Sequence, residues 1–172
     1  MVKAIFPGTF DPIHYGHMDI ARRASRLFDE VVMAVYDKPL KNLLFSPEER
    51  ISLVTQAFAD NPKISVTGYS GLTVEFARQI GAHVIVRGLR VFSDFEFEFR
   101  MGLANQRLAS DIETVAFITA EQHTFLSSST VKEIVSLQGD VSSMVPPYVE
   151  KALKTKVLNL GDSHSPPNSL RD

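Results

Sequence analysis

One segment near the start of the chain constrains the fold more than any other, because it joins a buried strand to an amphipathic helix through a short turn. The apolar run from Val2 to Phe6 predicts the strand. Apolar residues with the spacing of one helix face follow it: Ile20, Ala24, Leu27 and Phe28. Glycines in the turn PGTFDPIHYGH, positions 7–17, let the backbone bend tightly and approach a ligand. A helix that opens near Gly16 and His17 aims unpaired N–H groups at that ligand, so the segment predicts a phosphate-binding loop.

Two histidines belong to the same turn. His14 and His17 are three residues apart, so both imidazoles lie on one side of a helical first turn and can donate to one polyphosphate. Isolated histidines are more often ordinary surface or core residues. Here they follow the first strand at the mouth of the first helix, where open α/β sheets bind ligands, and this position favours a functional interpretation.

The rest of the chain alternates between apolar runs and helical patterns. Further strands are predicted for residues 30–36, 64–69, 83–87 and 114–119, and helices for residues 47–59 and 73–80. Ser46, Pro47 and Glu49 together make a helix start with an N-cap and a capping glutamate. Such alternation predicts the α/β class: a single Rossmann-like dinucleotide-binding domain with a parallel sheet flanked by helices.

The phenylalanine-rich stretch at residues 92–99 fits both a strand and a helix face. We interpret it as a helix that continues to Ala109, because Ser93 and Glu96 make a capping-box pattern and the segment is long for a strand. Its phenylalanines are expected to pack in the core. Helices are also expected from the serines at 127–129 to Leu137 and from Pro146–Pro147 onward. We expect residues 1–160 to form the domain and residues 161–172 a flexible tail.

Composition limits the classes of protein. A chain of 172 residues that is 44% hydrophobic suits one compact core. The formal charge of −2 argues against a broad nucleic-acid or membrane surface, while a local basic cluster stays compatible with it. The absence of cysteine excludes disulfides and a catalytic thiol. With no signal peptide or apolar spanning run visible, we expect a cytoplasmic protein with no membrane or nucleic-acid partner.

The polar residues favour phosphoryl chemistry by positioning and charge neutralisation. Arg87-Gly88-Leu89-Arg90 follows the predicted fourth strand and offers two guanidinium groups, although an ion pair is an alternative role for Arg90. The serines at 127–129 offer hydroxyls and helix N-terminal amides, and ordinary N-capping is their alternative. Asp94, Glu96 and Glu98 could suggest a metal site, but acids on an exposed helix face are usually solvated or paired with nearby arginines. No metal-ligand cluster with convincing spacing is present, so we expect no protein metal site.

Six separated motifs together resemble the bacterial phosphopantetheine adenylyltransferase family, within the nucleotidylyltransferases that share an (H/T)-x-G-H signature. The motifs are PGTFDPIHYGHMDI at 7–20, Lys41, VRGLR at 86–90, DFEFE at 94–98, FLSSS at 125–129 and QGDV at 138–141. The resemblance runs from about Lys3 to Leu153. It implies transfer of the adenylyl group of ATP to 4′-phosphopantetheine, giving dephospho-CoA and pyrophosphate.

The resemblance also implies residue roles. The catalytic residues are His17, which stabilises the transition state, Lys41 and Arg90. The acceptor-binding residues are Thr9, Lys41, Thr73 and Arg87, with Phe97 near the same acceptor. The ATP-binding residues are Thr9, Phe10, His14, His17, Gly88, Leu89, Arg90, Glu98, His123, Thr124, Phe125, Leu126, Ser127, Ser128 and Ser129. The family often has a bulky aromatic near 123 or 124, where this chain has His123-Thr124. From the residues alone, a turn hydrogen bond for Thr9 and a solvated Lys41 are the alternatives.

The resemblance extends to cofactor and partners. It implies Mg²⁺ held mainly by ATP phosphates and water, a homohexamer, and CoA as a feedback ligand. A nicotinate-mononucleotide adenylyltransferase is the alternative enzyme, because the histidine loop and serine motif alone serve several acceptors. A non-catalytic nucleotide-binding protein on the same fold is the alternative from another class, which the retained histidines and arginines disfavour.

Overall fold

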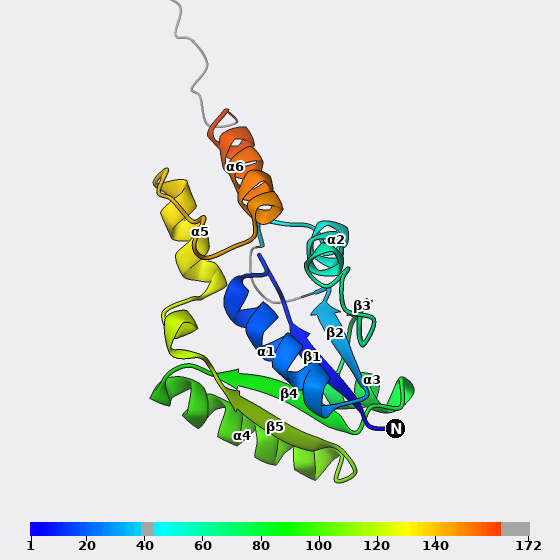
Figure 1. Cartoon of the computed structure of the whole chain (residues 1–172). Coiled ribbons are helices and arrows are strands. Elements are labelled where there is room, and N and C mark those ends of the chain that lie inside the picture. Colours follow the sequence, from blue (N-terminus) through cyan, green and yellow to red (C-terminus); the bar gives the residue numbers. More distant parts are fainter. Residues whose placement is uncertain (39–42, 163–172) are drawn as a thin grey trace, which may run out of the picture.

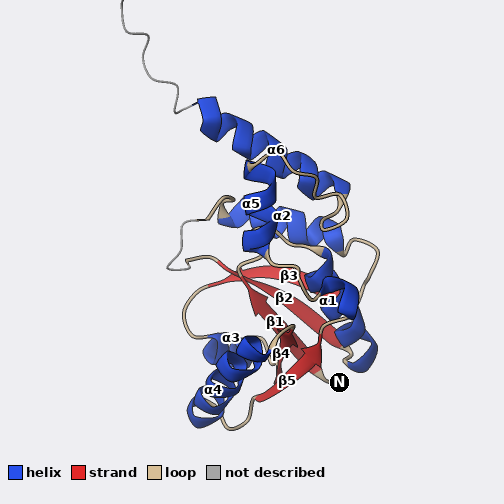
Figure 2. Ribbon diagram, turned by 90° about the vertical axis from the view of Figure 1, so that its left-hand side faces the viewer, coloured by secondary structure: helices blue, strands red, loops and turns tan. Residues whose placement is uncertain are grey.

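The computed structural model of the chain describes residues 1–38 and 43–162. The strands are β1 (Lys3–Gly8), β2 (Glu30–Tyr36), β3 (Ile64–Tyr69), β4 (Val84–Leu89) and β5 (Glu113–Ile118). The helices are α1 (Tyr15–Leu27), α2 (Pro47–Ala57), α3 (Thr73–Gln79), α4 (Phe92–Leu108), the short 3₁₀ turn η1 (Glu121–His123), α5 (Ser128–Ser136) and α6 (Pro147–Asp162). All strands pair in parallel in the order β3-β2-β1-β4-β5 (Figures 1 and 2). The predicted α/β class with a parallel sheet is confirmed.

Alternation along the central strands divides the core into two layers. In β1, Ala4 and Phe6 face a cluster that includes α1, α2, α5 and α6, whereas Ile5 faces a smaller cluster that includes α3. Successive side chains of a strand point to opposite faces, so a strand buried on both sides reads as a continuous apolar run. The fully buried strands β1 and β2 therefore gave the clearest sequence signal, and the predicted range of β2, residues 30–36, is confirmed.

Local caps fix several helix starts. Ser46 caps α2 by accepting a bond from the Glu49 N–H, and the Glu49 carboxylate accepts from the Ser46 N–H in return. This reciprocal pair satisfies two amides that the first helical turn leaves without partners. The predicted capping box at residues 46–49 is thus confirmed, as are the predicted starts of α5 after Ser127 and of α6 at Pro147.

The strand order creates a crevice between β1 and β4. From β1 the chain winds outward through β2 and β3, then returns to the other side of β1 for β4 and β5. Loops leaving the carboxyl ends of β1 and β4 therefore run to opposite sides and leave a space between them, the place where open α/β sheets bind ligands. The loop of residues 9–14 and the segment Gly88–Arg90 both lie at this position.

Two predictions for helix α4 are wrong. The helix itself is confirmed, but its N-cap is Val91, and neither Ser93 nor Glu96 makes the expected capping bonds. None of its 17 residues, all of them described, is buried, so its phenylalanines do not pack in the core of this chain. The 3.6-residue pattern identified an amphipathic helix correctly, but periodicity does not say what covers the apolar face.

Smaller differences occur at the ends of helices. Leu27, expected on the buried face of α1, is the last residue of the helix and is 70% exposed. Helix α6 continues to Asp162, two residues into the predicted tail, and residues 163–172 lie outside the described part of the chain. No helix within the described ranges is long and apolar enough to cross a membrane.

Candidate active site

A cleft of about 1040 Å³ opens at the carboxyl ends of β1 and β4. It is lined by most of the residues predicted to bind substrates: Thr9, Phe10, His14, His17, Thr73, Arg87, Gly88, Arg90, Phe97, Glu98, His123, Ser127 and Ser128. Among the described residues, the predicted positions Leu89, Thr124, Phe125, Leu126 and Ser129 do not line it. Lys41 lies outside the described residues. One crevice thus brings together segments that are far apart in the sequence.

The turn after β1 holds Phe10 beneath the histidines. Phe10 is buried in a left-handed backbone conformation, with φ of 50°, and its ring meets the ring of His17 edge-on at 5.0 Å between centroids. A Cβ on Gly8 would lie 2.8 Å from the Phe10 ring, so only glycine allows this packing. Phe10 is only 1% exposed, so it lines the cleft with little free surface and supports the His17 ring.

His14 and His17 form the start of helix α1. His14 is the N-cap residue; its Nδ1 accepts a bond from the His17 N–H at 3.3 Å, and the His17 Nδ1 accepts from the His14 N–H at 3.4 Å. The two rings stack, with centroids 3.6 Å apart and 18° between planes. The predicted placement of both imidazoles on one side of the first turn is what the structure has.

The electrostatic surroundings keep both imidazoles neutral. Burial, followed by the positive charges of Arg90 and His123, lowers the pKa of His14 to about 3. Burial, followed by His14, Arg90 and Arg87, lowers the pKa of His17 well below its ordinary value. A neutral imidazole still has one N–H to donate to an anionic ligand.

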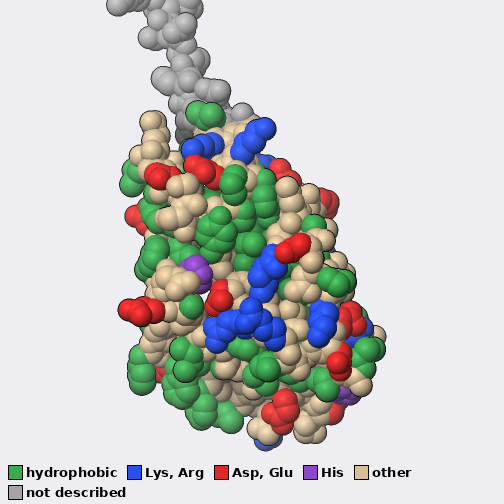
Figure 3. Space-filling view, in the orientation of Figure 1, with side chains coloured by type: hydrophobic (Ala, Val, Ile, Leu, Met, Phe, Trp, Pro, Cys, Tyr) green, Lys and Arg blue, Asp and Glu red, His purple; other side chains and the backbone are tan. Residues whose placement is uncertain are grey.

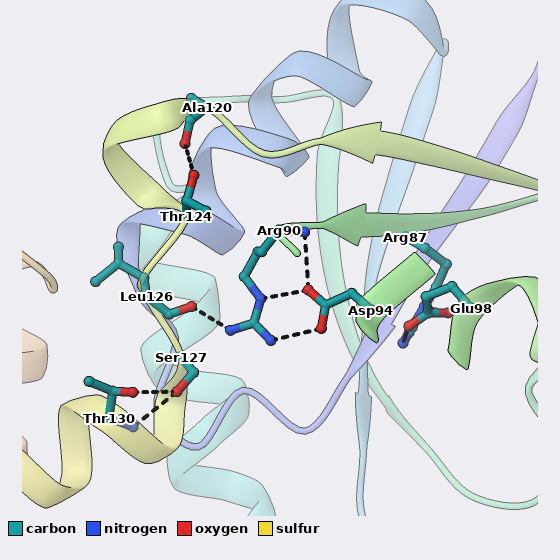
Figure 4. A network of polar contacts seen from close by, with 9 residues as sticks. All are labelled: Arg87, Arg90, Asp94, Glu98, Ala120, Thr124, Leu126, Ser127 and Thr130. Atoms are coloured by element: carbon teal, nitrogen blue, oxygen red, sulfur yellow. Dashed lines mark hydrogen bonds and ion pairs between the residues drawn. The ribbon is translucent and has the colours of Figure 1, made fainter. Parts of the chain in front are cut away.

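The two arginines after β4 are held by acids of helix α4 (Figure 4). The Arg87 guanidinium forms a two-point ion pair with the Glu98 carboxylate through Nε and Nη2. Its Nη1 donates to the Pro7 carbonyl at 3.0 Å. Arg90 donates to Asp94 through Nε at 3.0 Å and Nη2 at 3.2 Å. The ion pair that the sequence left open for Arg90 is therefore present, and fixed guanidinium groups face the cleft.

Arg90 also ties the end of β4 to the serine motif. Its Nη1 donates to the Leu126 carbonyl at 2.6 Å. Next in the chain, Ser127 caps α5 by accepting a bond from the Thr130 N–H at 3.0 Å, and Ser128 donates to the Pro12 carbonyl at 2.8 Å. The N-capping alternative for the serines thus holds for Ser127, while Ser127 and Ser128 still line the cleft. The α5 N-terminus, with its unpaired amides, closes one side of the crevice.

Hydroxyl and apolar side chains also line the cleft. The Thr73 hydroxyl, at the start of α3, shares a 2.9 Å hydrogen bond with the Tyr69 hydroxyl. Phe97 from α4 is half-exposed and lines the same cleft, as does Lys38, the last residue described before position 43. The hydroxyl and apolar side chains suit a ligand with an apolar or amide chain, whereas the histidines and arginines suit phosphate.

The described residues contain no group of three His, Asp or Glu side chains that could hold a metal ion. The expectation that the α4 acids pair with arginines holds: Asp94 contacts Arg90, Glu98 contacts Arg87, and Glu96 lies 4.0 Å from Arg100. These carboxylates are acceptors of guanidinium bonds. The cleft therefore suits a metal ion that arrives with phosphate ligands and water.

Three charged residues that support the site, of which Asp11 and Arg50 are buried, were not singled out from the sequence. Asp11 is 1% exposed; its carboxylate accepts bonds from the backbone of Leu44 and Phe45 and from Lys132 Nζ at 2.7 Å. Arg50 is fully buried and donates to carbonyls at the ends of β1 and β2. Asp11 stands inside the recognised loop motif, so it could have been found; Lys132 and Arg50 carry no local signal.

Comparison with known proteins places the chain among nucleotidyltransferases. The family model described as cytidylyltransferase-like matches residues 5–134. A phosphopantetheine adenylyltransferase of Roseiflexus sp. (strain RS-1) is 54% identical over 154 residues, covering 90% of this chain and 96% of that protein. One from Desulfitobacterium hafniense (strain DSM 10664 / DCB-2) is 50% identical over 153 residues, covering 89% and 94%.

A solved structure supports the fold. The crystal structure of a putative nicotinate-nucleotide adenylyltransferase from Vibrio parahaemolyticus superposes with a TM-score of 0.66 at 21% identity and covers 94% of both chains. At this level of identity the match bears on the fold, and it agrees with a Rossmann-like α/β domain.

Proposed function

Because the chain belongs to the phosphopantetheine adenylyltransferase family, we propose that its cleft transfers the adenylyl group of ATP to 4′-phosphopantetheine, giving dephospho-CoA and pyrophosphate. This is a step of coenzyme A biosynthesis. The observation that carries the proposal is the convergence of the His14–His17 pair, Arg87, Arg90 and the α5 N-terminus on one crevice. The crevice also offers hydroxyl and apolar side chains, from Thr73 and Phe97, for the pantetheine chain.

The reaction is a direct in-line displacement in this proposal. An oxygen of the acceptor phosphate forms a bond to the α-phosphorus of ATP, while the bond from that phosphorus to the bridging oxygen breaks and its electron pair leaves with pyrophosphate. The substrate supplies the nucleophile, so no covalent enzyme intermediate is needed. His17 donates to the phosphate oxygens as charge develops. Arg90 neutralises charge on ATP, and Lys41 neutralises charge on the acceptor phosphate.

The other residues divide between the two substrates. Thr9, Lys41, Thr73 and Arg87 hold the acceptor, with Phe97 beside its chain. ATP is held by Thr9, Phe10, His14, His17, Gly88, Leu89, Arg90, Glu98 and residues 123–129. Support for this proposal comes from the crevice, which Thr73, Phe97, both histidines and both arginines line together. Glu98 is assigned to the nucleotide and lies next to Arg87, whose Nε and Nη2 donate to its carboxylate.

The family suggests a divalent metal ion, and we assign it as Mg²⁺. The donor set of the cleft fits an ion held by ATP phosphates and water, because its nearby carboxylates Asp94 and Glu98 are occupied by arginines. When bound, Mg²⁺ supplies charge neutralisation on the triphosphate. The chain's own residues then orient the triphosphate that carries it. We also retain CoA as a feedback ligand and a cytoplasmic location in this proposal.

We expect 4′-phosphopantetheine, and not nicotinate mononucleotide, to support ATP-dependent pyrophosphate release. The acceptor end of the cleft is lined by Thr73, Phe97 and Leu72, which suit an extended pantetheine chain better than a pyridine nucleotide. Incubation with Mg-ATP and each phosphorylated acceptor, with pyrophosphate measured, tests this. Comparable turnover of the nicotinate acceptor would reject the acceptor assignment, and ATP binding without turnover of any acceptor would favour a nucleotide-binding protein.

Assembly into a homohexamer belongs to the same proposal, and helix α4 supports it. The large apolar side chains of this helix are each at least 42% exposed: Phe92, Phe95, Phe97, Phe99, Met101, Leu103 and Leu108. Phe97, Met101 and Leu108 line the cleft, whereas Phe92, Phe95, Phe99 and Leu103 share the other face of the helix. Hydrophobic side chains cover the lower left of the molecule, where α4 lies (Figures 1 and 3). Monomeric proteins rarely expose contiguous patches of this kind, so a second copy is the expected cover.

We expect light scattering after gel filtration to give a particle of six chains of 19.1 kDa each, and Phe99→Glu to yield smaller species. A charge in a buried interface is costly to desolvate, which disfavours association. Leu27→Glu is the matched control, because Leu27 is also exposed but lies at the end of α1. A parent particle of one chain, or equal effects of both substitutions, would contradict α4 as the contact surface.

A further inference from the structure

The cap of helix α1 uses two imidazoles where proteins commonly use oxygen acceptors. In the usual capping box a serine or threonine hydroxyl and a glutamate carboxylate each accept a backbone N–H bond, as Ser46 and Glu49 do at the start of α2. At α1 the same reciprocal bonds end on the Nδ1 atoms of His14 and His17. The cap therefore bears on which nitrogen of each ring carries a proton.

An imidazole nitrogen that accepts a hydrogen bond carries no proton, so the proton of a neutral ring sits on the other nitrogen. We infer that the α1 cap fixes His14 and His17 as neutral Nε2–H tautomers, which present two parallel N–H donors to the nucleotide phosphates and keep their protons throughout the reaction. Identification of the ligand as a nucleotide rests on the proposed function. The tautomers themselves follow from the cap.

Stacking makes the two donors act as one unit. The ring centroids are 3.6 Å apart and nearly parallel, so Nε2–H bonds from both rings can reach two oxygens of one phosphoryl group or of adjacent groups. A proton on either Nδ1 would point an N–H at a backbone N–H and break the cap. Two imidazolium ions at this separation would also repel each other strongly.

Charged groups around the two histidines also favour the neutral form of both rings. Arg87 and Arg90 approach from the end of β4, each paired with an acid of α4, Glu98 and Asp94, and His123 approaches from η1. On the opposite side, the Asp11 carboxylate is neutralised by Lys132 of α5. Burial is the main cause of the lowered pKa values of His14 and His17, and the arginines add to it, so lowering the pH toward 5 leaves the rings uncharged.

The glycine between the histidines is required by this arrangement. A Cβ on Gly16 would lie 3.1 Å from both Cε1 and Nδ1 of the His14 ring. That contact is tighter than normal packing and would push His14 away from the His17 N–H. Gly16 thus permits the stack and the cross-cap together, which gives a physical reason for a small residue at this place in the His-x-Gly-His spacing.

The consequence for catalysis is that His17 is not a general acid. One oxygen–phosphorus bond forms and another breaks, and the leaving pyrophosphate takes the electron pair without receiving a proton from the ring. A hydrogen bond from the ring stabilises the developing charge, and the ring keeps its proton. His14 contributes a second donor and holds the His17 ring in place by stacking.

Nitrogen NMR of the ring atoms tests the inference without any need for activity. The folded chain, with ¹⁵N in its five histidines, is recorded in long-range ¹H–¹⁵N spectra from about pH 5 to about pH 8. His14→Asn and His17→Asn assign the two rings. We expect each to show an unprotonated Nδ1 and a protonated Nε2 at every pH, with the exposed His83 as internal comparison. An Nδ1–H tautomer, or protonation of either ring in this range, would overturn the inference.

Gly16→Ala provides the second measurement. We expect it to abolish the matched pair of ring signals and to lower kcat by about 10-fold or more, as for a misplaced catalytic donor. Gly102→Ala is the control, because its Cβ would lie 3.9 Å or more from other atoms. Unchanged ring spectra in folded Gly16→Ala would show that the cross-cap does not fix the tautomers. If the parent spectra are as expected but no acceptor is adenylylated, the proposed function fails and the tautomer assignment stands.

Discussion

His17→Ala is expected to lower kcat by about 10²-fold or more, equivalent to roughly 2.7 kcal/mol of lost transition-state stabilisation. The ring is held by the cap of α1 and by Phe10, so its donor is already in place when charge moves onto the leaving pyrophosphate. An interaction that strengthens only in the transition state affects kcat, whereas uniform binding affects KM. The affinity for ATP, measured by equilibrium titration, should therefore change less than kcat, measured by pyrophosphate release.

Two further variants separate donation from structure. The amide of His17→Gln can place an N–H near the position of Nε2, so we expect it to recover about 10-fold of the loss. His83→Ala changes an exposed histidine just before β4, at the opposite end of that strand from the cleft, and should leave kcat unchanged. Circular dichroism first establishes an intact fold. Near-normal turnover of folded His17→Ala would mean that the transition-state role is wrong.

Much of the fold could be predicted because the relevant physics is local. A strand buried on both faces is a continuous apolar run, and this made the range of β2 readable to the residue. The range of β3 was also predicted to the residue, although this edge strand is only partly buried. The start of α2 followed from Ser46, Pro47 and Glu49 alone, since a capping box closes within one turn. The alternation of such elements implied a parallel sheet, and with it the position of the crevice.

The α4 phenylalanines show where local patterns stop being informative. Their spacing indicates an apolar helix face, and the usual cover for such a face is the protein's own core. In this chain α4 lies over β4 and β5 at the edge of the sheet and leaves Phe92 82% exposed. Whether an apolar face meets its own chain or another depends on the whole arrangement of elements. That arrangement is not encoded in the periodicity of one segment.

The candidate site also has features that the sequence predicts and contacts that it does not. The histidine loop, the arginine segment and the serine motif each adjoin the end of a strand or the start of a helix, so their convergence followed from topology. Their internal contacts did not. Lys132 and Asp11 are 121 positions apart, and the carboxylate also accepts the backbone bonds of Leu44 and Phe45. Nothing near Lys132 in the sequence distinguishes it from a solvated lysine on a helix.

Lys132→Met is expected to lower the free energy of unfolding by about 3 kcal/mol, the lower end of the cost of leaving one partner of a buried ion pair alone. Asp11 is 1% exposed, and Lys132 provides the positive charge that neutralises its carboxylate. Methionine keeps the length and packing of the side chain but removes the ammonium group. Urea denaturation near neutral pH, where an ordinary carboxyl is ionised, measures the change.

The control is Lys154→Met, which removes the exposed pair with Glu150 and should change stability by no more than about 0.5 kcal/mol. Asp11→Asn combined with Lys132→Met should recover part of the loss, because an amide can still accept from Leu44 or Phe45 and leaves no buried charge. Equal effects of the two lysine substitutions would mean that Lys132 is an ordinary surface lysine. A large loss confined to Lys132 would instead establish that the turn carrying His14, the segment before α2 and helix α5 are held together by one carboxylate. Substrate-binding loops from both sides of the cleft would then depend on that single buried charge for their relative positions.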